Sequence, residues 1–231
     1  MPADKEAYQR LKDHFSSKNV QLVAVSKTKP AEDILELYSM GQRDFGENYV
    51  QELVAKQPVL PGDIRWHFIG HLQSNKIKFI ASFVHLIHGV DSFKLLLAIN
   101  KEGIKVGRVI HVLLQMHIAK EETKFGFSEE ELGHCLEELK RSPLTHVHIS
   151  GFMGMASFTE NISAVRKEFR YLNETAHKYY PRFNECNAMQ ADAPCILSMG
   201  MSGDYACAIE EGSNMVRIGS LLFGARVYGS S

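Results

Sequence analysis

The sequence predicts an α/β fold, a closed (β/α)8 barrel of the TIM type with an extra N-terminal helix. Eight short apolar runs with strand character alternate with segments of helical period, a pattern typical of βα units around a parallel sheet. Eight such units in 231 residues fit the smaller end of the size range of this barrel. No linker or charge block interrupts the alternation, so residues 1–231 are predicted to form a single domain.

An open, doubly wound sheet is the alternative fold, because a strand count alone does not close a barrel. The dinucleotide-binding version of that fold carries a GxGxxG motif after its first strand. No such motif follows the first apolar run here.

The first half of the chain alternates from its start. An amphipathic opening segment predicts a helix over residues 3–17, and the apolar run QLVAVS predicts a strand over 21–26. Pro30 can open the next helix as a first-turn residue, and that helix should end near Gly41. The remaining elements of this half are a strand at 43–48, a helix through 51–57, a strand at 65–70, a helix through 75–81 and a strand at 84–90.

The second half repeats the pattern with longer helices. The segment EEELGHCLEELKR at 129–141 is strongly amphipathic, and a long helix is predicted over about 162–180. The other elements are a helix through 94–103, strands at 108–118, 145–155 and 194–201, a short helix at 205–212, and a last strand at 215–223.

Composition excludes several classes of protein. There are 26 Lys and Arg against 27 Asp and Glu, so the basic surplus typical of a nucleic-acid binder is absent. No apolar run approaches the roughly 18 residues that span a bilayer, and the charged start is unlike a signal peptide. The four cysteines lack CxxC spacing, which favours free thiols in a reducing compartment over a zinc site. We expect a cytoplasmic protein that binds neither nucleic acid nor membrane.

Lys27 stands at the end of the first predicted strand. Strand alternation puts it on one face with Val23 and Val25, and the carboxyl ends of barrel strands form the usual active-site mouth. Partial desolvation lowers the pKa of a lysine and makes its amine able to attack a carbonyl. The alternative is that Lys27 only extends into water from a strand end. Lys29 precedes Pro30, so its backbone should be extended and its side chain should point into solvent.

Two glycine and serine segments follow the last two predicted strands. They hold Gly200, Ser202 and Gly203 in one loop and Gly219 and Ser220 in the other. Glycine permits close approach of the backbone to a ligand, and barrels often bind phosphate between the loops after strands 7 and 8. Either segment alone reads as ordinary turn glycine, but the pair in these positions favours a phosphate site.

Arg217 and Asn48 are further candidates. The guanidinium of Arg217 lies within an apolar run, where it needs a partner: either a carboxylate, or the ring nitrogen of a bound cofactor. Asn48 ends a strand and either lines the mouth or serves as a turn residue.

Four methionines, Met153, Met155, Met199 and Met201, are expected to pack in the core, with some lining of the site.

Histidine spacing gives no metal signal. His67 and His71 are four apart, but a strand followed by a turn does not present them on one helical face. His146 and His148 share a strand face without a third ligand nearby in the sequence, so we expect core or surface histidines and no metal.

Six motifs in order resemble the pyridoxal phosphate homeostasis protein family, single-domain relatives of the N-terminal barrel of alanine racemase. The motifs are VAVSKTKP, FGENYVQE, WHFIGHLQSNK, GFMGM, LSMGMSGD and MVRIGSLLFGAR, and the match runs from about residue 21 to 226. The resemblance implies a fold-type III barrel with pyridoxal 5′-phosphate (PLP) as its cofactor. The sequence departs from the family at Gly70-His71, where many relatives have Gly-Pro, and at SGDY after Gly200.

The resemblance also implies roles for individual residues. Lys27 matches the lysine that forms the Schiff base with PLP, and Arg217 matches the partner of the pyridine nitrogen. The phosphate contacts fall on Ser202, Gly219 and Ser220, while Asn48 lies beside the cofactor and Met153 near it.

Binding without turnover is the function that we expect. Arginine does not readily give up its proton, so Arg217 would leave the pyridine nitrogen neutral and the electron sink weak. Racemisation needs a second base opposite Lys27, which alanine racemase takes from a tyrosine of its second domain. The expected protein is a monomeric PLP carrier acting in vitamin B6 homeostasis, with PLP-dependent apo-enzymes as possible recipients and indirect effects on amino-acid metabolism.

Two alternatives stay open. One is a weak PLP-dependent amino-acid racemase that uses Tyr49 or Tyr205 as the second base. The other is a phosphosugar-binding barrel without PLP.

Overall fold

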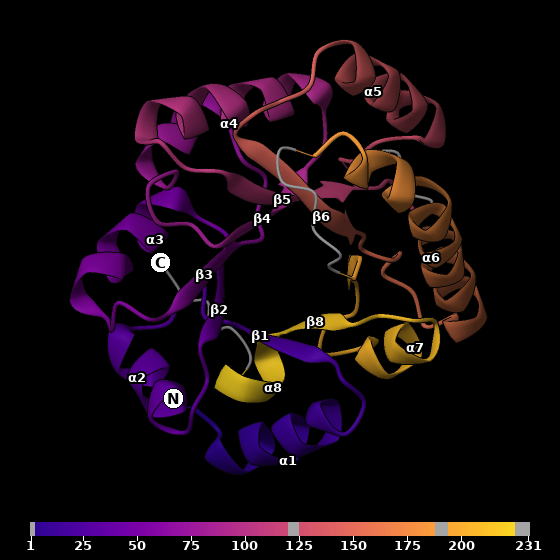
Figure 1. Ribbon diagram of the computed structural model, residues 1–231. Coiled ribbons are helices and arrows are strands. Elements are labelled where there is room, and N and C mark those ends of the chain that lie inside the picture. The colour runs from indigo at the N-terminus through magenta and orange to yellow at the C-terminus, as the bar shows by residue number, and fades with distance from the viewer. Residues whose placement is uncertain (1–2, 120–124, 188–193, 225–231) are drawn as a thin grey trace, which may run out of the picture.

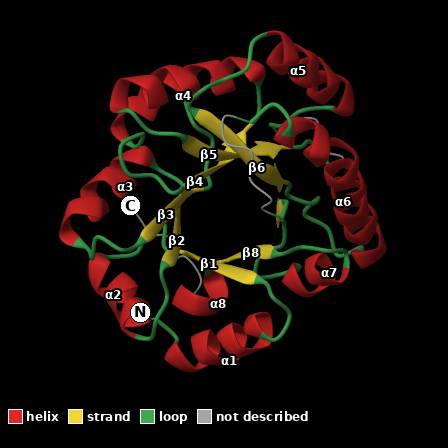
Figure 2. Ribbon diagram, viewed as in Figure 1, coloured by secondary structure: helices red, strands yellow, loops and turns green. Residues whose placement is uncertain are grey.

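Eight parallel strands form a closed barrel in the order β1 to β8, with β8 pairing back onto β1. The computed structural model describes residues 3–119, 125–187 and 194–224. Figures 1 and 2 show the strand ring enclosed by helices, which confirms the predicted fold class. The strands are β1 Gln21–Val25, β2 Asp44–Glu47, β3 Arg65–Phe68, β4 Leu86–Val90, β5 Ile110–Gln115, β6 Val147–Met153, β7 Ile196–Ser198 and β8 Met215–Ile218.

The helices cover the outside of the barrel and follow the predicted order. The extra N-terminal helix packs against β1 and against the last helix, α8. The α-helices are α1 Lys5–Ser16, α2 Ala31–Ser39, α3 Val50–Lys56, α4 Phe93–Val106, α5 Glu129–Arg141, α6 Ile162–Asn184, α7 Tyr205–Glu210 and α8 Ser220–Phe223, and two 3-10 helices are η1 Gln57–Val59 and η2 Ser74–Phe79.

The structure corrects two of the predicted elements and the position of Pro30 in a third. The strand predicted over 215–223 ends at Ile218, and the residues after Gly219 form α8, which buries Leu222 and Phe223. A short apolar run does not distinguish a buried strand from a buried helical turn, which explains this error. The helix predicted through 75–81 is the 3-10 helix η2. Pro30 occupies the N-cap of α2 rather than its first turn.

Alternate side chains of the strands enter two separate cores. Leu22 and Ala24 join the large core between the strands and the helices, whereas Val23 joins a small cluster within the barrel. This alternation agrees with the predicted face of β1. The inner cluster consists of Val23, Leu86, Leu113, Met153 and Met215.

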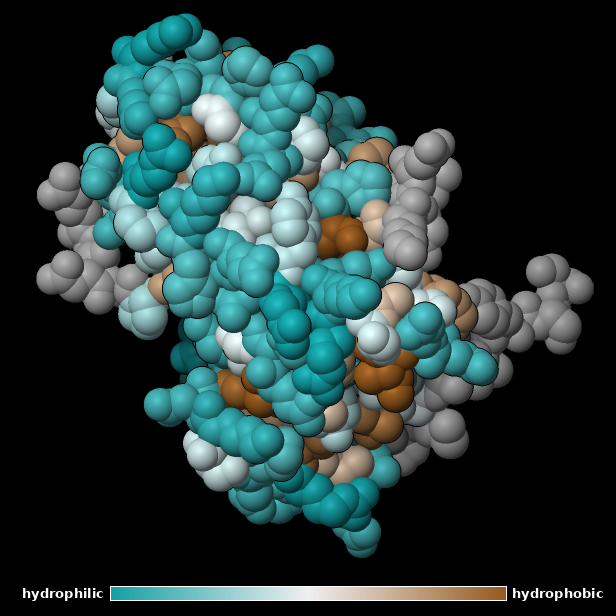
Figure 3. Space-filling view, turned by 90° about the vertical axis from the view of Figure 1, so that its right-hand side faces the viewer, coloured by the Kyte–Doolittle hydropathy of each residue, from teal (hydrophilic) through white to brown (hydrophobic). Residues whose placement is uncertain are grey.

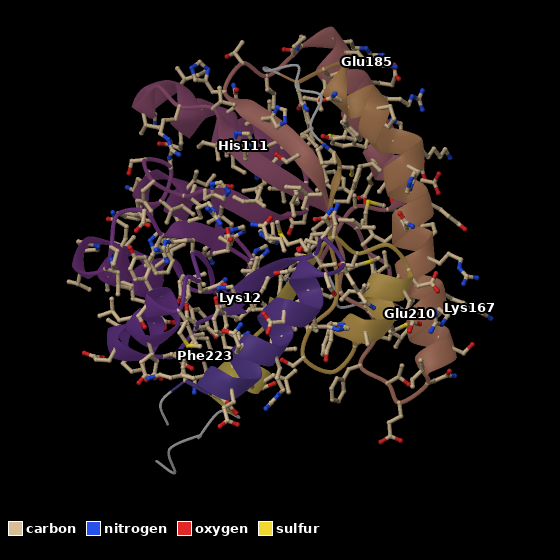
Figure 4. All side chains as sticks on the ribbon, turned by 60° about the horizontal axis from the view of Figure 1, so that its bottom comes forward. Lys12, His111, Lys167, Glu185, Glu210 and Phe223 are labelled. Atoms are coloured by element: carbon tan, nitrogen blue, oxygen red, sulfur yellow. The ribbon has the colours of Figure 1, made fainter. Side chains whose placement is uncertain are left out.

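The outer face over α6 and α7 is mainly hydrophilic (Figure 3). Arg166 of α6 forms ion pairs with Glu210 and Glu211, and Arg170 forms one with Glu211, so charged pairs tie the two helices together. Figure 4 shows Lys167 and Glu210 on these neighbouring helices. Within the described ranges, no helix has the length and apolarity needed to cross a membrane.

Helix α1 is fixed to the barrel by Phe15, and we predict that this contact is needed for stability. Phe15 is 1% exposed, and its ring packs edge-on against Tyr205 at 5.4 Å between centroids. Phe15→Ala should lower the free energy of unfolding by about 3–5 kcal/mol, because it leaves a cavity beneath the helix. Chemical denaturation measures the change. Phe158→Ala is the matched control, since Phe158 is fully exposed, and an equal loss in both variants would contradict the prediction.

Candidate functional site

A cavity of about 310 Å³ lies at the carboxyl ends of the strands. It is formed by residues at the ends of β1, β2, β3, β6, β7 and β8 and in the loops that follow them. Of the predicted site residues, it brings together Lys27, Asn48, Ser202, Arg217, Gly219 and Ser220. Met153 does not line this cavity, because its side chain packs in the inner cluster of the barrel.

Lys27 is carried by a tight turn directly after β1. The backbone N–H of Lys29 donates to the carbonyl of Ser26 at 3.0 Å, which closes the turn around Lys27 and Thr28. Thr28 has a φ of +63°, an unusual conformation for a β-branched residue, and its N–H donates to Glu52 Oε1 at 2.5 Å. The turn is therefore held by contacts from outside it, and the half-buried Lys27 is directed to the cavity.

Lys29 also lines this cavity, so the prediction that it points into solvent is wrong. Its ammonium group donates to the carbonyl of Phe223 at 2.6 Å (Phe223 is labelled in Figure 4). The helical turn of α8 creates this acceptor, and the sequence did not predict that helix. The hydrogen bond ties the loop after β1 to α8 across the rim of the cavity.

A buried ion pair supports the turn from below. Lys56 Nζ lies 2.8 Å from Glu47 Oε1 and 2.6 Å from Glu52 Oε1, and it also donates to the carbonyl of Ser26 at 2.9 Å. The hydroxyl of Ser26 donates to Glu47 Oε1 at 2.6 Å. Burial raises the pKa of the Glu47 carboxyl, and Lys56 opposes that shift. Sequence reasoning missed this pair, although a glutamate within a buried strand run was a signal for it.

Arg217 reaches into the cavity from β8. Its Nη1 donates to the Ser198 carbonyl at 2.8 Å and to the Ser198 hydroxyl at 2.6 Å, and its Nη2 donates to the Gly154 carbonyl at 3.2 Å. These neutral oxygens take the place of the carboxylate partner that was one of the two predicted alternatives. Burial lowers the pKa of Arg217 to about 10, with Asp204 opposing, so the guanidinium stays protonated at neutral pH.

The two glycine and serine segments meet at one side of the cavity. The N–H of Gly219 donates to Ser202 Oγ at 3.4 Å, which links the loops after β7 and β8. Gly200 has a φ of +95°, and a Cβ there would lie 2.7 Å from the Cβ of Ala208. The chain thus needs glycine at 200 to turn from β7 towards α7. Ser220 lines the same cavity, so the predicted phosphate residues are adjacent.

Asn48 presents an unused acceptor to this cavity. Its Oδ1 is buried and has no hydrogen-bond partner in the described part of the chain. A buried polar atom without a partner costs free energy, so it indicates a place where a ligand group binds. Gly70 permits this arrangement, because a Cβ at 70 would collide with the carbonyl oxygen of Asn48.

The departures from the family motifs lie around the cavity. His71 does not line it; its Nδ1 lies 3.2 Å from Asp91 Oδ2, and its ring stacks on Phe125. Asp204 accepts the N–H of Met201 at 2.6 Å within the loop after β7. Both residues shape loops at the mouth.

Apolar side chains complete the lining, and sequence reasoning only partly identified them. Ile69, Met155 and Met201 line the cavity, and both methionines had been predicted as core residues with some lining of the site. No tyrosine is among the described residues that line it. Tyr49 is 54% exposed, and Tyr205 packs against α1, so neither is placed opposite Lys27 across the cavity.

The closed parallel barrel is a fold that this chain shares with alanine racemase. Residues 3–227 match the family model described as alanine racemase, N-terminal domain. Alanine racemase from Bartonella henselae, solved with covalently bound pyridoxal phosphate, is similar in fold, with a TM-score of 0.68 at 15% identity. The match covers 95% of this chain and 59% of that one.

More similar proteins place the chain within this class. The pyridoxal phosphate homeostasis protein of Vibrio alginolyticus is 38% identical over 226 residues, covering 96% of this chain and 93% of the relative. PipY of Synechococcus elongatus PCC7942, solved with PLP bound, has a TM-score of 0.80 and 34% identity, covering 94% of this chain and 100% of PipY. The chain belongs to the family of pyridoxal phosphate homeostasis proteins, as its motifs predicted.

We predict that the buried pair of Glu47 and Lys56 stabilises the fold around Lys27. Lys56→Met should lower the free energy of unfolding by about 3–5 kcal/mol, because it leaves the carboxylate of Glu47 buried without a counter-charge. Adding Glu47→Gln to that variant should restore part of the loss. Chemical denaturation of the single and double variants measures both effects.

Lys140→Met is the matched control for this prediction. Lys140 pairs with Glu137 at 2.9 Å on an exposed helix face, where an ion pair contributes less than about 1 kcal/mol. Equal destabilisation in the two single variants would show that the buried pair has no special role.

Proposed function

We propose that this protein binds PLP in the cavity at the barrel mouth and holds it as a Schiff base on Lys27. In this proposal it stores and delivers the cofactor without turning over a substrate. The observation that carries the proposal is the convergence of Lys27, the two glycine and serine loops and Arg217 on one cavity of about 310 Å³. The family membership and the PLP-bound structure of PipY support it.

In this proposal each of the predicted site residues has a role in binding PLP that fits its position. The amine of Lys27 condenses with an aldehyde, and one water leaves as the C=N bond forms. Ser202, Gly219 and Ser220 hold the phosphate with hydroxyl and backbone N–H groups, and Asn48 Oδ1 accepts a hydrogen bond within the cavity. Arg217 donates to the ring nitrogen. Met153 belongs to the inner cluster against which the cavity residue Met155 packs, so it would lie near the cofactor without lining the cavity.

The chemistry of the cavity favours storage over catalysis. When bound, PLP supplies an electron-withdrawing ring, which works best when its nitrogen is protonated. Arg217 stays charged at neutral pH and offers a hydrogen bond rather than a proton. No tyrosine lies among the described residues that line the cavity, so none of these residues offers a phenol opposite Lys27 as a second base. We infer a monomeric, single-domain cytoplasmic carrier that serves PLP-dependent apo-enzymes.

Covalent attachment at Lys27 tests the proposal. The wild-type protein mixed with PLP should show the absorption of a lysine-bound cofactor, and borohydride should fix one cofactor to the peptide that contains Lys27. Lys27→Ala should lose the label and bind PLP at least about tenfold more weakly, by ~1.4 kcal/mol, while the phosphate contacts keep some affinity. Peptide mapping and dialysis measure the two effects.

Lys29→Ala is the control for this experiment, because Lys29 lines the same cavity two residues away. In the Lys29→Ala variant, borohydride should still fix the cofactor to Lys27. A label on Lys29 in the wild-type protein, or a protein that binds no PLP, would contradict the proposal, and the latter result would favour a phosphosugar-binding barrel.

Exchange of the α-hydrogen separates a carrier from a racemase. In D2O, the PLP-loaded protein should not incorporate deuterium into L-alanine above the level seen with Lys27→Ala, because Arg217 leaves the ring nitrogen unprotonated and the electron sink weak. Proton NMR of the amino acid follows the exchange. Sustained exchange that disappears in Lys27→Ala would establish the racemase alternative.

A further inference from the structure

A chain of hydrogen bonds crosses the inside of the barrel and ends on Arg217. Asp44 Oδ1 lies 3.0 Å from His67 Nε2, and His67 Nδ1 lies 2.9 Å from His88 Nε2. His88 Nδ1 is 3.1 Å from Ser198 Oγ, the atom that accepts from Arg217 Nη1 at 2.6 Å. The groups come from β2, β3, β4, β7 and β8 in turn. His67, His88 and Ser198 are fully buried, so the hydrogen bonds between them are shielded from solvent.

The acceptor at the Asp44 end, together with neutral histidine rings, sets the direction of this chain. A guanidinium only donates, so Arg217 donates to the Ser198 hydroxyl. Burial alone would raise the pKa of Asp44, but hydrogen bonds from Arg65 and His67 hold it well below its usual range, so its carboxylate only accepts. Burial also holds the pKa of His88 well below its ordinary value, which keeps this ring neutral.

With His67 in its neutral form, every group between these ends donates towards Asp44. The Ser198 hydroxyl donates to His88 Nδ1, His88 Nε2–H donates to His67 Nδ1, and His67 Nε2–H donates to Asp44. Each ring then carries its hydrogen on Nε2. The hydroxyl hydrogen of Ser198 is used in the bond to His88. The hydroxyl oxygen therefore acts towards Arg217 only as an acceptor.

The far end of the chain is already charge-balanced without a metal ion. Asp44, His67 and His85 offer ligand atoms within 4.8 Å of one another. Both carboxylate oxygens of Asp44, however, are bound by Arg65, at 2.7 Å from Nε and 2.5 Å from Nη2. This bidentate contact balances the charge of the carboxylate and holds it at Arg65, the first residue of β3.

We propose that Asp44, His67, His88 and Ser198 form a relay that positions the guanidinium of Arg217 towards the ring nitrogen of the cofactor. The inference rests on the proposed function and assigns these side chains to it as positioning residues. Ser198 holds Nη1 through both its carbonyl and its hydroxyl, and the Gly154 carbonyl holds Nη2. The relay fixes the hydroxyl, and thereby one of the three contacts that set the plane of the guanidinium at the cavity wall.

Substitutions at His88 test the relay. Glutamine can accept from Ser198 through its carbonyl and donate to His67 through its amide, whereas leucine can do neither. His88→Leu should shift the absorption maximum of bound PLP and weaken its affinity about tenfold, and His88→Gln should restore both values to within about threefold of wild type. Ser198→Ala, a smaller change, should reproduce the effect of His88→Leu if that variant does not fold.

His111→Gln is the matched control. His111 lies on β5 (Figure 4) and bonds to Ser150 at 3.0 Å, so it belongs to the same barrel but not to the relay. Its PLP spectrum and affinity should match wild type. Circular dichroism of all variants confirms that the barrel is intact.

A second measurement needs no cofactor. Nitrogen-15 NMR of the PLP-free protein should show the Nε2–H tautomer for both His67 and His88, and equimolar Zn²⁺ should leave these resonances unchanged. An Nδ1–H tautomer on either ring, or zinc bound at His67, would overturn the relay.

The outcomes separate this inference from the proposed function. Wild-type spectrum and affinity in folded His88→Leu or Ser198→Ala would overturn the relay alone, and PLP binding would stand. Failure of the wild-type protein to take up PLP would overturn the proposed function and, with it, the role of the relay at the ring nitrogen.

Discussion

The pairing of β8 with β1 is the constraint on which the site depends. In this parallel register Val23 lies opposite Arg217 and Ala24 opposite Ile218, so the two chain segments end side by side. Lys27 follows one strand, and Gly219 and Ser220 follow the other. Residues about 190 positions apart in the sequence therefore meet at one rim, and an open sheet would separate Lys27 from the two glycine and serine loops and from Arg217.

The interior of this barrel is divided between two kinds of contact. Val23, Leu113 and Met215 belong to the apolar cluster that fills part of it, while His67 and His88 belong to a hydrogen-bonded path. Barrel interiors are commonly filled by branched apolar residues, and buried polar groups cost free energy unless each has its partners. Here each group of the path has a hydrogen-bond partner on both sides. Arg217 at the mouth is thereby connected to Asp44 at the opposite end of the barrel.

Lys27, the residue proposed to bind the cofactor, is held by contacts on both sides of its turn. Thr28 keeps a positive φ because Glu52 accepts its N–H, and Lys56 binds the carbonyl of Ser26 from below. Such strain persists only where surrounding contacts determine the backbone. The buried ion pair between Glu47 and Lys56 is thus part of the site, although neither side chain lines the cavity.

Local pattern in the sequence determined the order of elements, the inward face of Lys27 and the presence of a buried arginine at 217, because alternation and apolar runs are properties of neighbouring residues. It did not determine where Lys29 or residues 220–223 lie, since packing against distant strands and helices decides whether a residue points into solvent, lines the rim or forms a helical turn. The hydrogen-bonded path from Asp44 to Arg217 likewise cannot be predicted from the sequence pattern. Its members come from five strands, and only closure of the barrel brings their side chains within hydrogen-bonding distance.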